Sequence, residues 1–495
     1  MKLMLIEPNF EGYVLMPTMS LAVLKGYVKN AKTKSGINHE VKIVDLIFNK
    51  KNWEERVLNE IKTFNPDLIG ISVLSFNYTQ GIKLANIIKK NSNAKIIFGG
   101  VHTILSSEEV IANDSVDMIC VGEGEEVLQE LLDKNLECKN VNGIWYKKDG
   151  KIIKNKPRKL IEKLDKIPFP EWDDFDMEKY FLINNNHLPI MASRGCPYSC
   201  TYCSNHALKK KLVGKYVRFR SVDNVIQEIE LRINQYYDKG MRYLFFYDDT
   251  FIMYKDFILE FCKKFKEKGF DKKVKWNANV RANLVTDEIM KAMKDAGCYE
   301  VRMGVEAAND YIRNDIYKRN MTKEQISNAI EIIKRNGLIL RLQFILGAPY
   351  ENIEMMRESF EMAKKSGADY VLFPILIPLP STEIKELCEK ENLIEKDKFE
   401  NFRDMFINPV AKTKFASSEE VKELVEEIRN YEIKKYIKLG FKLGGARFLK
   451  DSLMFLAYYK NKYGLELDHA YRFTVNKYIL EDLKKNENST DTTKL

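Results

Sequence analysis

The chain has 495 residues, of which 45% are hydrophobic and 31% charged, and its net charge is +9. This length exceeds one ordinary domain, and the composition is that of a folded protein, which excludes a disordered or fibrous chain. The charge excess is small for the length, so a Lys-rich solvated surface explains it better than a nucleic acid or another polyanionic partner.

The first residues, MKLMLIEPNF, lead directly into a strand-like apolar segment. They lack the apolar stretch and cleavage site of a signal peptide, and no window of about 18 apolar residues predicts a membrane span. We therefore expect a cytoplasmic protein. In that reducing compartment, clustered cysteines among the eight in the chain predict metal or redox chemistry, not a disulfide scaffold.

Residues 1–145 alternate short Val/Ile/Leu-rich strands with amphipathic helices. The expected strands are LMLIEP, EVKIVDLIF, DLIGISVLS, AKIIFGG and DMICVGEG, and the expected helices are 19–29, 54–64, 80–90 and a short one after Ser106. This pattern predicts an α/β fold with a doubly wound parallel sheet and helices on both faces. A ligand is expected at the carboxyl ends of the strands.

The rest of the chain divides into four parts. Residues 146–187 carry charge runs and prolines and are predicted to be a linker between domains. Residues 188–405 resume the alternation, with six expected strands: LPIMAS, RYLFFYDD, VKWNANV, YEVRMGVE, LILRLQFILG and DYVLFPIL. A closed barrel needs eight such units, so we expect an open, partial (β/α)6 barrel. Residues 406–486 have a helical pattern, and the polar residues 487–495 are expected to be disordered.

Three cysteines follow the first barrel strand with the spacing C-x3-C-x2-C: Cys196, Cys200 and Cys203. A tight strand-end loop can direct three thiolates at one cluster, and three protein ligands leave one iron of a [4Fe–4S] cluster open to another molecule. A structural zinc site needs a fourth ligand, for which only His206 is close in sequence. Unligated buried cysteines do not require this spacing.

This segment closely resembles the radical S-adenosylmethionine (SAM) superfamily over about residues 188–380. The resemblance implies that the open iron chelates SAM and that an electron, delivered by a donor such as flavodoxin or ferredoxin, cleaves it to a 5′-deoxyadenosyl radical. It also places Tyr202 near the adenine. Polar groups at other strand ends, among them Asp248 and Arg281, are expected around SAM and substrate. Of these, Arg302, Gly304 and Glu306 are our main candidates, because a cation suits the carboxylate of SAM and a carboxylate suits its ammonium or ribose.

The N-terminal domain resembles the cobalamin-binding fold of corrinoid methyltransferases. That family carries D-x-H-x-x-G after the first strand, S-x-L after a middle strand and paired glycines after the next. Residues 7–12 read EPNFEG, residues 72–74 read SVL, and Gly99 is followed by Gly100. Asn9 stands where the family has its cobalt-ligating histidine, so the resemblance implies cobalamin held without that histidine.

The remaining positions of this resemblance have a coherent physical role. Ser72 can bond the nucleotide tail of cobalamin beside Leu74, and the two glycines let the tail pass close to the backbone. Residues 121–125, VGEGE, also resemble radical enzymes with this pair of domains. A dinucleotide site is excluded, because no G-x-G-x-x-G follows the first strand.

The sequence therefore predicts a cobalamin-dependent radical SAM enzyme, with C-methylation of an unactivated carbon as the leading function. Ring formation, rearrangement or C–C bond formation with the same cofactors is the first alternative. Methylthiolation needs three more cysteines in the N-terminal domain, which offers only Cys120 and Cys138. An iron–sulfur electron carrier or a cobalamin-sensing module is the alternative of another class. The substrate is not identified by any motif.

Overall fold

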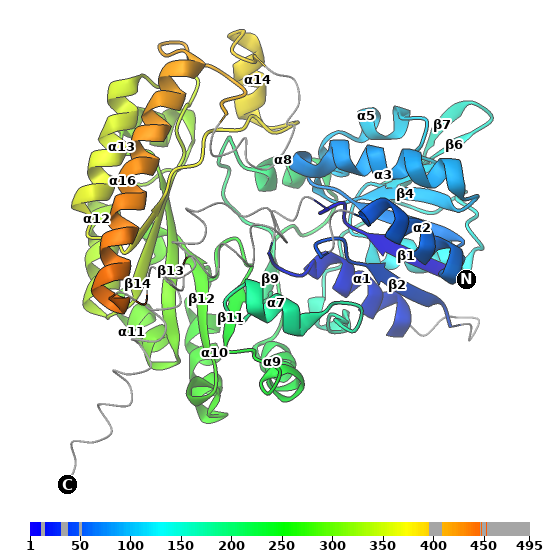
Figure 1. The fold of residues 1–495 in the computed structure, drawn as a ribbon, viewed down its shortest axis with the longest axis horizontal. Helices are drawn as coiled ribbons and strands as arrows, with labels where there is room; N and C mark the ends of the chain where they lie inside the picture. The colour runs from blue at the N-terminus through cyan, green and yellow to red at the C-terminus, as the bar shows by residue number, and fades with distance from the viewer. Residues whose placement is uncertain are drawn as a thin grey trace.

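The chain forms two α/β lobes that lie beside one another (Figure 1). The computed structural model describes residues 1–10, 15–30, 38–48, 52–395 and 408–445, together with 447 and 452. The N-terminal lobe contains a seven-stranded sheet, and the second lobe contains a six-stranded parallel sheet. The predicted fold class is confirmed.

The N-terminal sheet has the strand order β2-β1-β3-β4-β5-β6-β7. Its five parallel strands are β1 (Lys2–Ile6), β2 (Glu40–Val44), β3 (Leu68–Ser72), β4 (Lys95–Gly99) and β5 (Met118–Cys120). Leu3 and Leu5 pack toward α1 (Met19–Asn30) and α6 (Glu125–Asp133), whereas Met4 and Ile6 pack toward α2 (Trp53–Phe64) and α3 (Tyr78–Asn91). Apolar side chains therefore cover both faces, as a doubly wound sheet requires.

The sheet continues past residue 145, the predicted end of the first domain. β6 (Ile144–Lys148) pairs antiparallel with β5, and β7 (Lys151–Lys154) pairs antiparallel with β6. Asp149 and Gly150 have φ of 50° and 73°, the conformation of a two-residue hairpin turn. The lysines of this edge hairpin look like a linker charge run, but the Asp-Gly pair was a hairpin signal. The predicted linker also contains a helix, α7 (Met177–Ile183).

The second sheet has the order β15-β14-β13-β12-β11-β8, all parallel. Its strands are β8 (His187–Ile190), β11 (Tyr243–Phe246), β12 (Lys275–Val280), β13 (Cys298–Glu306), β14 (Ile339–Phe344) and β15 (Tyr370–Leu372). The covering helices are α9 (Val222–Tyr236), α10 (Lys255–Glu267), α11 (Asp287–Asp295), α12 (Lys323–Arg335) and α13 (Ile353–Lys365). The six strands match the predicted partial barrel.

Several barrel helices begin at a side-chain cap. Ser221, Thr286, Thr322 and Asn352 each accept a hydrogen bond from a backbone N–H of the first turn of the helix that follows. Such caps satisfy donors that a helix leaves unpaired, which fixes where each helix starts. The sequence therefore sets the helix boundaries locally.

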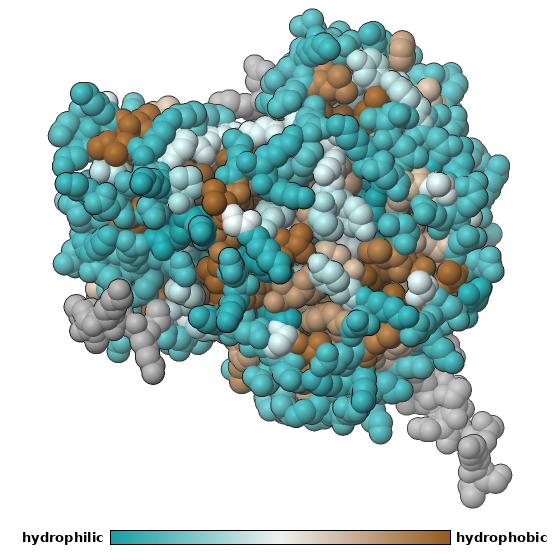
Figure 2. All heavy atoms as spheres, turned by 180° about the vertical axis from the view of Figure 1, so that it is seen from behind, coloured by the Kyte–Doolittle hydropathy of each residue, from teal (hydrophilic) through white to brown (hydrophobic). Residues whose placement is uncertain are grey.

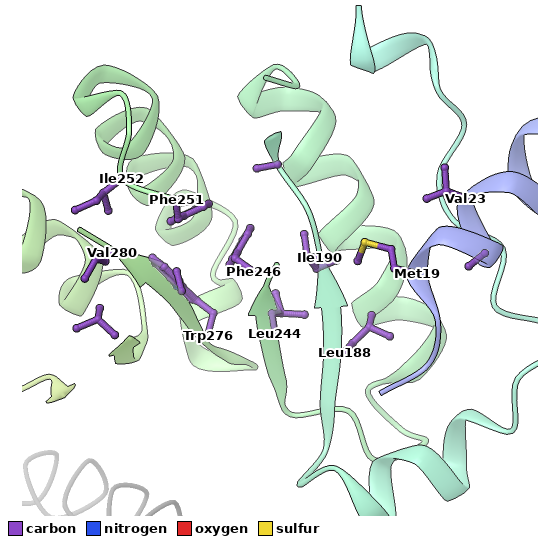
Figure 3. Close-up of a cluster of buried hydrophobic side chains, with 14 of the residues drawn as sticks. Met19, Val23, Leu188, Ile190, Leu244, Phe246, Phe251, Ile252, Trp276 and Val280 are labelled. Carbon is purple, nitrogen blue, oxygen red and sulfur yellow. The ribbon is translucent and has the colours of Figure 1, made fainter. Parts of the chain in front are cut away.

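One hydrophobic cluster extends through both lobes (Figure 3). Met19 of α1 lies beside Leu188 and Ile190 of β8, next to the aromatic residues of the barrel such as Phe246. All of these side chains are buried. The N-terminal lobe is therefore packed onto the first barrel strand and is not a separate body on a tether.

The predicted C-terminal helical region is represented by α16 (Ser418–Gly444), which packs on α13. The predicted disordered tail, residues 487–495, lies outside the described residues. The rear surface is mostly hydrophilic, with apolar side chains gathered toward its middle (Figure 2). None of the described helices combines the length and apolar character that a membrane span requires.

Candidate functional site

The three spaced cysteines lie on one loop at the carboxyl end of β8. The loop starts after the short strand β9 (Ser193–Arg194) and ends where α8 (Ser204–Lys211) begins, directly after Cys203. Gly195 opens it with a φ of 83°, and a Cβ there would lie 2.5 Å from the carbonyl oxygen of Tyr216. A glycine is therefore needed to turn the chain into the loop.

All three thiols are free, and each is buried or half-buried. Burial, with smaller contributions from Asp249 and the other two cysteines, raises the pKa of Cys203 to about 12. Burial also raises the pKa of Cys196. The thiols are thus close enough to affect one another, and a metal centre that binds all three must displace their protons.

The three thiols do not converge as ligands of a single ion do: within the described ranges, no three His, Cys, Asp or Glu side chains are placed to hold one. A cubane cluster instead distributes its ligands over separate irons. His206 Nδ1 lies 3.6 Å from Glu383 Oε1, so it contacts a carboxylate rather than the cysteines. The donor set fits an iron–sulfur cluster better than the zinc alternative.

Tyr202 and Glu306 meet beside the cysteine loop. Tyr202 hydrogen-bonds Glu306 and packs edge-on against Tyr317, with ring centroids 5.0 Å apart. Glu306 ends β13 at a register shift and has a φ of 70°, a strained conformation for a residue other than glycine. A Cβ at Gly304 would collide with the Glu306 carboxylate. The absence of a side chain at Gly304 leaves the space that the Glu306 carboxylate occupies, so the two predicted positions form one structural unit.

Two arginines lie under the loop, and the sequence singled out only one of them. Arg319 Nη1 lies 3.6 Å from Cys200 Sγ, and its guanidinium lies 3.6 Å from Glu306. Arg281 stacks on Tyr198 with its guanidinium 3.8 Å from the ring centroid. Among the described residues, the buried Nε and Nη1 of Arg281 have no hydrogen-bond partner. Unpaired buried donors of this kind fit an anionic ligand.

Arg319 carried no periodic or motif signal in the sequence. It follows a single helical turn, between Lys318 and Asn320, which both have positive φ. Its approach to Cys200 spans 119 residues of chain. Only the folded structure could identify it.

Arg302 does not lie with these groups. Its Nε donates to Glu300 Oε1 at 2.7 Å, and its guanidinium covers Phe245 at 4.1 Å from the ring centroid. Arg302 precedes Glu306 by four residues on the same strand, a separation of roughly 13 Å at 3.3 Å per residue. The structure therefore places Arg302 toward the amino end of the barrel, apart from the cysteine loop.

The predicted cobalamin positions gather at the carboxyl edge of the N-terminal sheet. The strand order reverses direction between β1 and β3, and ligands of such sheets bind at that reversal. Asn9 follows β1, where its N–H donates to the Glu7 carbonyl at 2.8 Å. Ser72 ends β3, and Leu74 donates its N–H to Asn77 Oδ1 at 2.7 Å. No described residue hydrogen-bonds the Ser72 hydroxyl, whereas Gly12 lies outside the described residues.

Gly99 and Gly100 differ in what surrounds them. A Cβ at Gly99 would meet nothing within 4 Å, and the same holds at Gly122 on the neighbouring strand end. Gly100 has a φ of 94°, and a Cβ there would lie 2.5 Å from the Val73 carbonyl oxygen. Gly99 thus borders an open cradle that fits a cofactor tail, while Gly100 is required by the backbone itself.

The two edges are joined by an ion-pair network. Arg194, two residues before Cys196, donates to Glu123 at 2.7 Å and to Glu125 at 2.6 Å. Arg218 also donates to Glu123, at 2.8 Å. The acids belong to the VGEGE stretch after β5, so the cysteine loop is fixed directly to the cobalamin-like face. The sequence noted this stretch without identifying its partners.

Two family models match the chain: the radical SAM superfamily over residues 190–363 and the B12 binding domain over residues 12–132. An uncharacterized methyltransferase of Pyrococcus horikoshii is 31% identical, covering 86% of this chain and 91% of the relative. The anaerobic magnesium-protoporphyrin IX monomethyl ester cyclase of Rubrivivax gelatinosus is 28% identical, covering 83% and 74%.

Two solved structures share the fold of both lobes. The radical SAM methyltransferase TsrM from Kitasatospora setae, with cobalamin and a [4Fe–4S] cluster bound, has a TM-score of 0.67 at 16% identity, covering 79% of this chain and 75% of that one. The cobalamin-dependent SAM radical enzyme OxsB, with aqua-cobalamin and SAM bound, has a TM-score of 0.66 at 18% identity, covering 100% and 82%.

Proposed function

Because the chain belongs to the radical SAM enzymes that carry a B12 binding domain, we propose that it is a cobalamin-dependent methyltransferase acting on an unactivated carbon. The observation that carries the proposal is the Arg194–Glu123 contact of 2.7 Å, which holds the cysteine loop against the cobalamin-like edge. A methyl carrier and a radical source must lie this close to act on one substrate.

In this proposal, Cys196, Cys200 and Cys203 hold a [4Fe–4S] cluster, and Asn9, Ser72, Leu74, Gly99 and Gly100 border cobalamin. When bound, the cluster supplies the electron that cleaves SAM, and cobalamin carries the methyl group. Tyr202 and Glu306 position SAM, and Gly304 leaves space for the Glu306 carboxylate. The unpaired donors of Arg281 would bind the carboxylate of SAM. Burial of these groups limits water at the site.

We place the enzyme in the cytoplasm, because the three thiols proposed to hold the cluster must be kept reduced. An acidic electron donor such as flavodoxin or ferredoxin fits the run Lys209–Lys211 at the end of α8, the helix that directly follows Cys203. Complementary charge would guide such a donor to the cluster side of the molecule.

Ring formation with the same cofactors is the second candidate. It is favoured by one specific finding, the 28% identity to the anaerobic cyclase over 83% of this chain. The two candidates differ in the fate of the methyl group of SAM: a methyltransferase consumes it, whereas a cyclase need not.

The test uses full-length protein purified without oxygen, with its iron and corrinoid contents measured first. Incubated with a strong reductant and SAM, it should form both 5′-deoxyadenosine and S-adenosylhomocysteine. Addition of the purified enzyme together with methyl-labelled SAM to an extract of cells that lack the enzyme should then yield a product heavier by one labelled methyl group. Formation of 5′-deoxyadenosine without S-adenosylhomocysteine would favour the cyclase, and absence of both would refute an active radical enzyme.

A further inference from the structure

A polar cavity of about 190 Å³ lies at the amino ends of the barrel strands, opposite the end that carries the cysteine loop. Its barrel wall includes His187, Phe245, Glu300, Arg302 and Arg341. Met16 and Asn184, which precede the barrel in sequence, line it from the other side. The cavity therefore lies in the amino-terminal end of the barrel, next to the N-terminal lobe.

The described lining of this cavity contains two arginines and one acid. Glu300 is the one acid in its lining, and it pairs with both Arg302 at 2.7 Å and Arg341 at 3.1 Å. Burial would raise the pKa of Glu300, but Arg341 and Arg302 together lower it to about 2. Burial, with Arg302, lowers the pKa of His187 to about 4, so its ring is neutral. Within this lining, Arg302 and Arg341 thus share the carboxylate of Glu300.

The guanidinium of Arg302 is fixed in position and has donors left for a ligand. Its Nε is engaged by Glu300, and its plane rests on Phe245 with the guanidinium 4.1 Å from the ring centroid. In the part of the chain that the structure describes, no group accepts a hydrogen bond from its two terminal nitrogens. A fixed guanidinium with these two donors facing a cavity matches the paired oxygens of a carboxylate or phosphate.

We propose that this cavity binds an oxyanion of the substrate, a carboxylate or a phosphate group, with Arg302 as its main donor and Arg341 as the second cation. The inference rests on the proposed function, because it assumes that the substrate enters this barrel. Since Arg302 and Glu306 are separated by roughly 13 Å along β13, the substrate is an elongated acid. Its charged end is anchored here while its reacting carbon reaches toward the cysteine loop.

The experiment measures binding of inorganic phosphate and of acetate to the loaded full-length protein by titration calorimetry, with and without saturating SAM. Chloride at equal ionic strength is the control for screening. We expect one of the two ions to bind equally well with and without SAM, and the preferred ion to identify the acid class. Arg302→Gln should raise its dissociation constant at least about tenfold, because a charge-assisted hydrogen bond is lost. Arg302→Lys, which keeps the charge but loses the paired donors, should give an intermediate value.

Arg335→Gln is the matched control, because Arg335 pairs with Asp287 on the exposed side of the barrel. It should bind the ion as the wild type does. Equal affinity in both Arg302 variants and the wild type, or no binding of either ion by the wild type, overturns the inference. Competition between SAM and the anion also overturns the inference, since Arg302 would then bind SAM.

The proposed function is tested separately in the same wild-type and Arg335→Gln preparations by 5′-deoxyadenosine formation. Cleavage of SAM without anion binding refutes only the oxyanion site. Anion binding without cleavage refutes only the radical enzyme. If Arg302→Gln does not fold, the anion affinity of Arg302→Lys relative to the wild type tests the oxyanion site.

Discussion

Among single residues, the adjacent glycines Gly99 and Gly100 have different roles: one leaves room for a ligand, and the other is required by the backbone conformation. Gly100 has positive φ and touches the Val73 backbone, so any side chain there strains the fold. Gly99 has neither constraint. A substitution at Gly100 would therefore confuse loss of ligand with loss of structure, and Gly99 is the position that tests cofactor binding.

Gly99→Leu is expected to lower the affinity for corrinoid at least about tenfold. The leucine side chain would occupy the open space beside Gly99 and would exclude the cofactor tail from it. The iron content and far-UV circular dichroism should stay as in the wild type. Reconstitution with hydroxocobalamin followed by gel filtration measures the bound corrinoid. Gly100→Leu serves as the contrast, since it should also lose folded structure; unchanged corrinoid in Gly99→Leu would contradict the assignment of the cradle.

The cysteine loop makes an equally local prediction. Replacing Cys196, Cys200 or Cys203 singly with Ala should remove the iron–sulfur absorbance and reduce the bound iron to background, because a cubane held by two thiolates is not retained. Cys262→Ala is the control, since Cys262 is buried in α10 with burial as the main cause of its raised pKa of about 12. Full iron in any of the three loop variants would argue against the ligand set.

Glu351 makes the stability of the protein depend on pH. Its carboxylate accepts hydrogen bonds from the N–H groups of Gly347 and Ala348, yet burial raises its pKa from 4.5 to about 8. Between these values the folded state holds a proton that the unfolded state has lost, so the free energy of unfolding falls as pH rises from 4.5 to 8.

Glu351→Gln should remove this dependence. Its stability relative to the wild type is expected to increase with pH by at most about 1.4 kcal/mol per unit across that window. Urea unfolding at several pH values measures it. Glu331→Gln, on the exposed side of α12, is the control and should leave the pH profile of the wild type unchanged. A Glu351→Gln profile parallel to that of the wild type would mean that Glu351 is charged when folded.

At the scale of elements, the loop after β5 and the strand β9 are tied together by buried charge. Glu123 accepts hydrogen bonds from Arg194, Arg218 and the N–H of Ile161. Each partner comes from a different segment, so the carboxylate fixes three segments at one point. The contacts of Arg194 at this junction fix the start of the cysteine loop, because Gly195 and Cys196 directly follow Arg194.

Glu123→Gln should lower the free energy of unfolding by about 2 kcal/mol, because it leaves two largely buried guanidiniums without their shared anion. Chemical denaturation measures the loss. Glu126→Gln is the matched control: Glu126 is more exposed and pairs with Arg158, so its loss should cost less than about 0.5 kcal/mol. Equal stability of the two variants would show that the junction is not a structural clamp.

At the scale of the whole molecule, the continuous hydrophobic cluster makes the two lobes one folding unit. Met19 of the N-terminal lobe is 8% exposed and packs beside the first barrel strand (Figure 3). Apolar surface buried between lobes couples their stabilities, because neither lobe can lose the contact alone.

Met19→Ala is therefore expected to destabilise both lobes together, by about 3 kcal/mol, as for other large-to-small core substitutions. Amide hydrogen exchange should show that β1 and β11 lose protection at the same denaturant concentration. Ile152→Ala, on the exposed edge strand β7, should change stability by less than about 1 kcal/mol. Separate loss of protection in the two strands would indicate independent domains.

Features that depend on a local pattern of residues could be predicted from the sequence alone. Apolar alternation predicted the parallel strands, and the C-x3-C-x2-C spacing predicted the loop of three thiols. These are properties of residues close along the chain. The Asp149–Gly150 turn was equally local, although the lysines around it suggested a linker.

Contacts between residues far apart in the chain could not be predicted, because they depend on how the whole fold packs. Arg319 reaches Cys200 across 119 residues, and Arg194 reaches Glu123 across 71. Conversely, Arg302 and Glu306 are neighbours in sequence yet lie at different depths of the barrel, because an extended strand separates them by about 3.3 Å per residue. The sequence gives the chemical type of each side chain, but the distance between two side chains is set by how strands and helices pack.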